Sequence, residues 1–167
     1  MVPRCSESLR SNPIWPININ MNMNMNMNMK PNTTTTTAPT SRNALKVLLV
    51  DNDSFQLELI TGILESLGVS DVTQTTSGEQ ALQKLSGKHG FHLLLLDLHM
   101  PGMDGFKFME SLAKVGFTGA LVIVSGQSND VMHGASLVAR LSHFTLLGTV
   151  PKPVGRAALL ALIAKLA

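Results

Sequence analysis

Cysteine is nearly absent from this sequence of 167 residues, in which Cys5 is the only one. A single thiol excludes a disulfide within the chain and any cysteine-based metal site. No apolar run approaches the roughly 18 residues that a membrane span needs. The N-terminus also lacks the apolar stretch of roughly 7–15 residues that is typical of a secretory signal. These absences together predict a cytoplasmic protein that has no membrane partner.

Charged residues are also scarce, at 14% of the chain against 44% hydrophobic residues. The formal net charge of +2 is unevenly divided, because residues 1–43 carry +3 and residues 44–167 carry −1. The second part therefore lacks the basic field that nucleic-acid binding requires. We expect one domain with a single apolar core, which does not itself bind nucleic acid.

Low-complexity sequence fills much of the first part of the chain. Residues 18–29 read NINMNMNMNMNM, and five threonines follow at residues 33–37. Such composition predicts a disordered tail over residues 1–43 and a folded domain over residues 44–167. A start codon placed upstream of the true one would give the same pattern. A Met-rich interaction segment is the functional alternative.

From Ala44 onward, apolar runs of strand length alternate with helical patterns. Three of the runs are continuously apolar, which is typical of a parallel sheet that is covered on both faces. Right-handed crossovers then predict an α/β fold with a single doubly wound five-stranded parallel sheet. The expected strands are residues 46–50, 69–76, 91–97, 119–126 and 144–150, and the expected helices are residues 54–67, 77–87, 105–116, 128–143 and 155–166.

Polar residues follow the predicted strands where each strand ends. Asp51 and Asn52 follow the first strand, Asp97 ends the third, Ser125 ends the fourth, and Lys152 follows the fifth. In a doubly wound sheet, ligands bind at this edge. Carboxylate and amide oxygens suit Mg²⁺, while an ammonium and a hydroxyl suit phosphoryl oxygens. A carboxylate can also attack phosphorus and form an acyl phosphate.

The segments VLLVDND, LLLLDLHMPGMDGF, VIVSG and VPKP occur in this order within residues 46–166. With them, the chain resembles the receiver domain of bacterial two-component response regulators, which has a flavodoxin-like fold. The resemblance implies that Asp97 is the phosphoacceptor, that Ser125 is the switch hydroxyl and that Lys152 pairs with the phosphoryl group. It also implies that Asp51 and Asn52 occupy the acidic-pair positions. A weaker resemblance, in FQLEL and LLGTVPKP, is to receivers joined to cyclic-di-GMP phosphodiesterase domains.

The resemblance further implies Mg²⁺ as the cofactor. Its ligands would be Asp51, Asn52, Asp97 and the backbone carbonyl of His99. The peptide bond between Lys152 and Pro153 is implied to be cis, as is known at X-Pro bonds.

Two positions depart from the family pattern. Asn52 stands where the family usually has a second acidic residue that binds the metal directly, so we expect weaker Mg²⁺ binding. Thr149 stands at a switch position that is often aromatic, so the switching movement is expected to be smaller or different. Asp53 is more simply a helix-start residue than a ligand, and Asp104 with Gly105 a turn that starts a helix.

Several other residues carry weaker expectations. His99 and Gln127 are expected to influence the lifetime of a phosphoaspartate through water access. The alternative for His99 is a three-ligand transition-metal site with Asp51 and Asp97. The other histidines are taken as surface or core-edge residues: His89, His92, His133 and His143.

The leading functional hypothesis is a phosphorelay signalling switch rather than a free-standing enzyme. A histidine kinase or phosphotransfer protein would phosphorylate Asp97, and an output protein or a lost C-terminal effector domain would receive the signal. The last helix is apolar nearly all round, which leaves open a homodimer or a lost covering domain. The alternative is a pseudo-receiver that binds protein constitutively. A small phosphohydrolase is disfavoured, because no carboxylate follows Asp97 by two residues.

Overall fold

The computed structural model describes residues 44–87 and 90–166, so the predicted tail at residues 1–43 and His89 lie outside the described residues. Strands and helices alternate along the described chain, as predicted. The strands are β1 (Lys46–Val50), β2 (Asp71–Thr75), β3 (Leu93–Asp97), β4 (Ala120–Ser125) and β5 (Thr145–Pro151). The helices are α1 (Ser54–Ser66), α2 (Gly78–Leu85), α3 (Gly105–Lys114), α4 (Asn129–Leu141) and α5 (Arg156–Ile163), with a 3₁₀ turn over Ala164–Leu166.

All five strands pair in parallel in one sheet, in the order β2-β1-β3-β4-β5. The strand order reverses direction at β1, since β2 lies on one side of it and β3 on the other. Ligands of doubly wound sheets bind outside the carboxyl ends of the strands at such a reversal. The fold therefore directs attention to the residues that follow β1 and β3.

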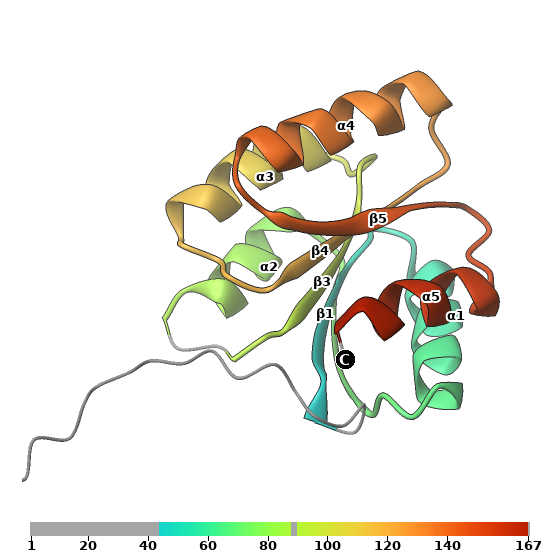
Figure 1. Cartoon of the computed structure of the whole chain (residues 1–167). Helices are drawn as coiled ribbons and strands as arrows, with labels where there is room; N and C mark the ends of the chain where they lie inside the picture. Colours follow the sequence, from blue (N-terminus) through green and yellow to red (C-terminus); the bar gives the residue numbers. More distant parts are fainter. Residues whose placement is uncertain (1–43, 88–89, 167) are drawn as a thin grey trace, which may run out of the picture. The chain divides into compact units, whose positions relative to one another are not determined.

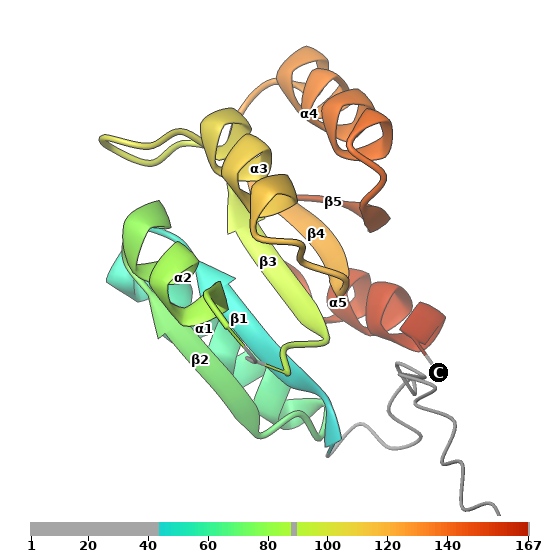
Figure 2. The ribbon, with the colours of Figure 1, turned by 90° about the vertical axis from the view of Figure 1, so that its left-hand side faces the viewer.

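Helices cover both faces of the sheet: α1 and α5 lie on one face, and α2, α3 and α4 lie on the other (Figures 1 and 2). The side chains of β1 divide accordingly. Val47 and Leu49 pack in the core cluster with α1 and α5, whereas Leu48 and Val50 pack in the cluster with α2, α3 and α4. Because both faces of the strand are buried, its sequence is continuously apolar. The predicted fold class is confirmed.

Side chains that accept hydrogen bonds begin three of the helices. Asp53 is the N-cap of α1 and accepts from the Phe55 amide, and Asp104 is the N-cap of α3 and accepts from the Lys107 amide. Ser77 caps α2 in the same way. The predictions that Asp53 and Asp104 begin helices are confirmed. Such caps satisfy backbone donors that have no partner within the helix.

The last helix places its large apolar residues inward, where Leu159, Leu162 and Ile163 are buried against the sheet. Its exposed positions are mostly small: Ala157, Ala158, Ala161 and Ala164. The exposed apolar surface of this helix is thus smaller than its sequence suggests. A homodimer through this helix stays a prediction.

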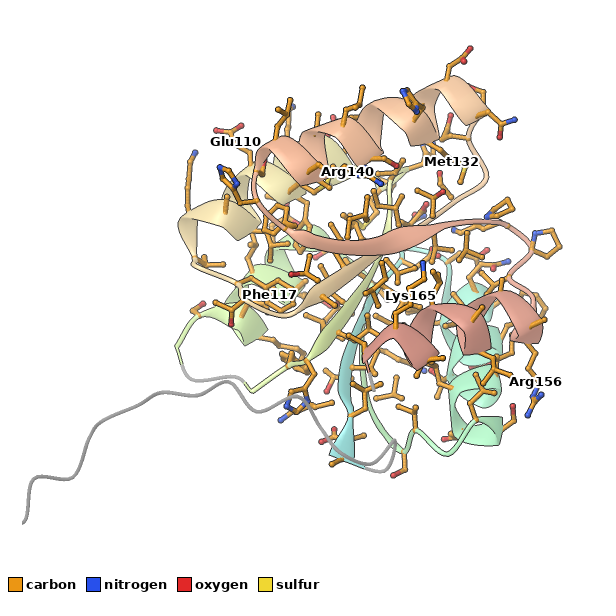
Figure 3. The ribbon with its side chains drawn as sticks, in the orientation of Figure 1. Glu110, Phe117, Met132, Arg140, Arg156 and Lys165 are labelled. Atoms are coloured by element: carbon orange, nitrogen blue, oxygen red, sulfur yellow. The ribbon has the colours of Figure 1, made fainter. Side chains whose placement is uncertain are left out.

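Polar contacts hold the last helix at both ends (Figure 3). The Arg156 guanidinium donates to the Ser66 hydroxyl at 3.2 Å, and the Lys165 ammonium donates to the Leu147 carbonyl at 2.8 Å. The first contact joins α5 to the end of α1, and the second joins the 3₁₀ turn to β5. No helix within residues 44–87 and 90–166 is long and apolar enough to cross a membrane.

Candidate functional site

Two buried aspartates lie side by side at the carboxyl edge of the sheet. Asp51 directly follows β1 and Asp97 is the last residue of β3, and the register pairs Val50 with Leu96. Asp51 is 3% exposed and Asp97 is 4% exposed. Buried carboxylates are costly unless a partner compensates their charge.

Lys152 supplies that compensation. Its ammonium lies 2.6 Å from Asp51 Oδ2 and 3.2 Å from Asp97 Oδ2. The lysine comes from the segment after β5, two strands away from β3. One cation therefore bridges two carboxylates, and the three side chains carry a net charge of −1.

The backbone around Lys152 joins it to the end of β4. The Lys152 amide donates to the Ser125 carbonyl at 3.0 Å, and Ser125 itself is fully buried. The Ser125 hydroxyl accepts from the Gln127 amide at 3.2 Å. The Lys152–Pro153 peptide bond is cis, as the resemblance implies.

The pKa values of this cluster reflect both burial and charge. Burial raises the pKa of the Asp97 carboxyl; Lys152 opposes this effect and Asp51 reinforces it, and the pKa stays above its usual range. Burial also disfavours the charged form of Lys152, but hydrogen bonding to Asp51 and the charges of both aspartates outweigh it. The pKa of Lys152 is accordingly raised, so the ammonium stays charged.

Backbone groups hold both aspartates in place. The Asp51 amide donates to the Thr75 carbonyl at 3.2 Å, and the buried Thr75 hydroxyl donates to the Leu49 carbonyl at 2.9 Å. The backbone amide of His99 hydrogen-bonds to the Asp97 carboxylate. Sequence reasoning missed the contribution of Thr75. The only sequence feature that pointed to Thr75 was its position near the end of the weakest predicted strand.

The other predicted site residues lie around the buried cluster. The side chains of Asn52, His99 and Gln127 are exposed. Asn52 directly follows Asp51, whereas His99 and Gln127 lie two residues after Asp97 and Ser125. Thr149 is half-buried in β5, where it pairs with Ile123 of β4. The structure thus brings Asp51, Asp97 and Lys152 into contact, with Ser125 beside them. The roles of all the predicted site residues stay predictions.

The remaining histidines fit the surface or core-edge interpretation. His133 and His143 are exposed, and His92 is half-buried with its Nδ1 atom accepting from the Lys46 amide at 3.0 Å.

Few acidic side chains at this edge of the sheet are available to bind a metal ion. Within residues 44–87 and 90–166, no cluster of three or more histidine, cysteine, aspartate or glutamate residues could hold a metal ion. The two carboxylates of Asp51 and Asp97 still match the one or two that Mg²⁺ commonly uses. The residues present therefore suit a magnesium ion that keeps much of its water.

A small cavity of about 10 Å³ lies against the two aspartates. Its other walls are apolar, and they come from β1, β3, β4 and from Leu57 and Ile60 of α1. An apolar floor keeps the local dielectric low, which strengthens the interaction of each carboxylate with Lys152.

A sequence model of the response regulator receiver domain matches residues 47–164. The chain belongs to this family. The resemblance that VLLVDND, LLLLDLHMPGMDGF and VPKP indicated is thereby confirmed. Receiver domains are signalling domains of two-component systems; they generally bind Mg²⁺ at the phosphorylation site, and they interact with histidine kinases and output domains.

Curated relatives of this receiver domain include two bacterial proteins. A probable chemotaxis protein CheY of Rhizobium etli is 29% identical over 111 residues, which are 65% of this chain and 81% of that protein. A CpxR homolog of Haemophilus influenzae, a transcriptional regulatory protein, is 35% identical over 95 residues, which are 56% of this chain and 40% of that protein.

Among solved structures, a response regulator from Colwellia psychrerythraea is 27% identical, with a TM-score of 0.63. That match covers 74% of this chain and 96% of the other. By contrast, the matched part spans only 14% to 40% of four curated relatives. The activities and partners of those longer proteins belong to the whole proteins, of which this chain matches only a part. The likeness to receivers joined to cyclic-di-GMP phosphodiesterase domains stays a prediction.

Proposed function

We propose that this receiver domain accepts a phosphoryl group on Asp97 from the phosphohistidine of a histidine kinase or phosphotransfer protein. A carboxylate oxygen of Asp97 attacks phosphorus, the phosphorus–nitrogen bond of the donor breaks, and the imidazole leaves with the electron pair. The product is an acyl phosphate on Asp97. The observation that carries this proposal is the Lys152 ammonium, which lies within 3.2 Å of the Asp97 carboxylate.

Phosphoryl transfer depends mainly on positioning and on neutralising charge. Lys152 supplies a fixed positive charge and donors for phosphoryl oxygens. The backbone hydrogen bond from the Lys152 amide to the Ser125 carbonyl supports a joint role for these two residues. The Ser125 hydroxyl would turn toward the phosphoryl group while the Lys152 ammonium pairs with it.

Mg²⁺ fits this proposal as the cofactor. When bound, it would neutralise part of the charge between the acceptor and the incoming phosphate. Asp51, Asp97 and the His99 backbone carbonyl would hold it, and Asn52 would contribute an amide oxygen. Because an amide carries no formal charge, we expect weaker Mg²⁺ binding than in receivers with two acidic residues before α1.

The signal would leave through the face formed by α4, β5 and α5. Ser125 ends β4 opposite Pro151, and Thr149 lies two positions earlier in β5. A threonine cannot move a ring inward, so the change at this face would be small. Exposed His99 and Gln127 would tune the hydrolysis of the phosphoaspartate by controlling water access. The proposed setting is the cytoplasm, with an output protein or a C-terminal effector domain as the receiver of the signal.

A small phosphodonor tests the proposal directly. Incubation of the chain with acetyl phosphate and Mg²⁺ should give an acid-stable, base-labile phosphoryl adduct, and Asp97→Ala should abolish it. Asp53→Ala is the matched control, because it removes a neighbouring exposed carboxylate that caps a helix. An adduct that persists in Asp97→Ala would refute the assignment of the acceptor.

One observation favours a second function, a pseudo-receiver that binds protein without phosphorylation. Asn52 is exposed and uncharged, and the described residues contain no acidic trio for a metal. If the chain forms no adduct and binds no beryllofluoride at high Mg²⁺, this second function replaces the first.

A further inference from the structure

The loop between β3 and α3 closes through a contact that only glycine permits. Gly105 is buried at the first position of α3, and its amide donates to the Leu98 carbonyl at 3.0 Å. A Cβ atom placed on Gly105 would lie 2.8 Å from the Leu98 Cα atom and 3.1 Å from the Asp97 carbonyl oxygen. A Cβ contact of 2.8 Å with a backbone atom essentially never occurs, and one of 3.1 Å is tight, so a side chain here must displace the backbone at Leu98, next to Asp97.

Neither side of this contact can easily move away. On the helix side, Phe108, Met109 and Leu112 anchor α3 in the core and are fully buried. On the strand side, β3 is an interior strand that pairs with both β1 and β4. Interiors are closely packed, so a shift of either element costs stability or moves the short segment between them.

That short segment carries the group that contacts the acceptor. His99 directly follows Leu98, and its backbone amide hydrogen-bonds to the Asp97 carboxylate. A displacement of Leu98 is therefore transmitted to the donor that orients the reacting carboxylate.

We infer that Gly105 is a positioning residue for phosphoryl acceptance: its missing side chain sets the His99 backbone against Asp97. This inference rests on the proposed function, and it adds a residue that touches neither phosphate nor metal. Errors of about 1 Å in a reacting group can cost on the order of 100-fold in rate. The requirement comes from space, and the conformation of Gly105 itself is one that any residue can adopt.

The test compares Gly105→Ala with Gly62→Ala in the full chain. A Cβ on Gly62, in α1, would meet nothing within 4 Å, so Gly62→Ala is the matched control. Gly134 in α4 is equally open. In a second comparison, Gly105→Ala is introduced into a background that carries both Gly62→Ala and Gly134→Ala. These two substitutions should offset the destabilisation caused by Gly105→Ala, because alanine favours helix more than glycine. Thermal unfolding establishes that the compared proteins are folded.

Two readouts follow, the rate of adduct formation from acetyl phosphate and the backbone amide chemical shifts of residues 97–100. In the folded Gly105→Ala variant, we expect a rate at least about tenfold below that of the background, together with shifted His99 and Asp97 amides. A rate within about twofold of the background overturns the inference. A Gly105→Ala chain that stays unfolded in the stabilised background also overturns it, because the requirement is then purely structural.

Failure of the proposed function is recognised separately. If the parent chain forms no adduct, the chemical shifts alone decide the role of Gly105. Amides of residues 97–100 that move in Gly105→Ala and not in Gly62→Ala support the positioning role, and unmoved amides refute it.

Discussion

Lys152 is the single positive charge that two buried carboxylates share. Its ammonium lies within 3.2 Å of both Asp51 and Asp97. Loss of one partner from a buried ion pair leaves an uncompensated charge, which costs far more than the pair contributes. The stability of this edge of the sheet should therefore depend on Lys152.

Replacement of Lys152 by methionine should destabilise the folded chain by about 3–5 kcal/mol at pH 7. The control is Lys114→Met, which removes the exposed ion pair with Glu110 and should change stability little. Urea unfolding followed by circular dichroism measures both. Equal losses of stability in the two variants would mean that the buried contacts of Lys152 contribute no more to stability than the exposed ion pair of Lys114.

The raised pKa of Asp97 predicts a second, pH-dependent effect. Burial makes the folded state bind the Asp97 proton more tightly than the unfolded state, so the charged form lowers stability at neutral pH. Asp97→Asn should thus be more stable than the parent at pH 7. The difference should shrink as the pH falls through the raised pKa and the parent carboxyl becomes neutral. Unfolding midpoints measured from pH 7 down to about pH 4 check this, and a difference that grows on acidification would contradict it.

Asn52 gives a prediction about the metal. Asn52→Asp adds a full negative charge at an exposed position next to Asp51. At about 4 Å in water, each pair of unit charges interacts by about 1 kcal/mol, so a divalent ion should bind at least about tenfold more tightly. Titration with Mg²⁺, followed by NMR, measures the affinity. Unchanged affinity would mean that Asn52 does not occupy the metal-facing position.

At the scale of elements, helix caps decide where several segments begin. Asp104 accepts a hydrogen bond from the Lys107 amide at 2.9 Å, whereas Ser128, the N-cap of α4, makes no side-chain cap bond. Asp104→Ala should therefore cost about 1 kcal/mol, and Ser128→Ala much less. Chemical denaturation of both variants tests this, and similar losses would show that the cap geometry does not matter here.

The ends of the elements also mark what a sequence can predict. The helix expected at residues 128–143 spans Asn129–Leu141, and the strand expected at residues 69–76 spans Asp71–Thr75. Helical spacing and apolar runs show that an element exists, but hydrogen bonds at its ends determine its limits. β2 was the weakest prediction because it is an edge strand, whose residues are mostly exposed or half-buried.

At the scale of the whole molecule, two apolar clusters on opposite faces of one sheet hold the domain together. Each cluster contains residues from all three central strands and from helices far apart in the sequence. The membership of the chain in the receiver family agrees with this architecture. The division of the chain into a tail over residues 1–43 and a domain over residues 44–167 stays a prediction.

The alternation of strands and helices, the parallel sheet and the polar residues after each strand were all determined by the sequence itself. These signals are local: periodicity, cap residues and continuous apolar runs each depend on a few neighbouring residues. They were sufficient to nominate Asp51, Asp97 and Lys152 for one edge of the sheet.

Only the tertiary structure decided which side chains meet. It showed one lysine bridging two aspartates, Thr75 supporting Asp51, and the large residues of α5 turned inward. It also showed the close approach of Gly105 to Leu98. Such contacts depend on register and packing between distant segments, and the pattern of a single segment carries no information about them.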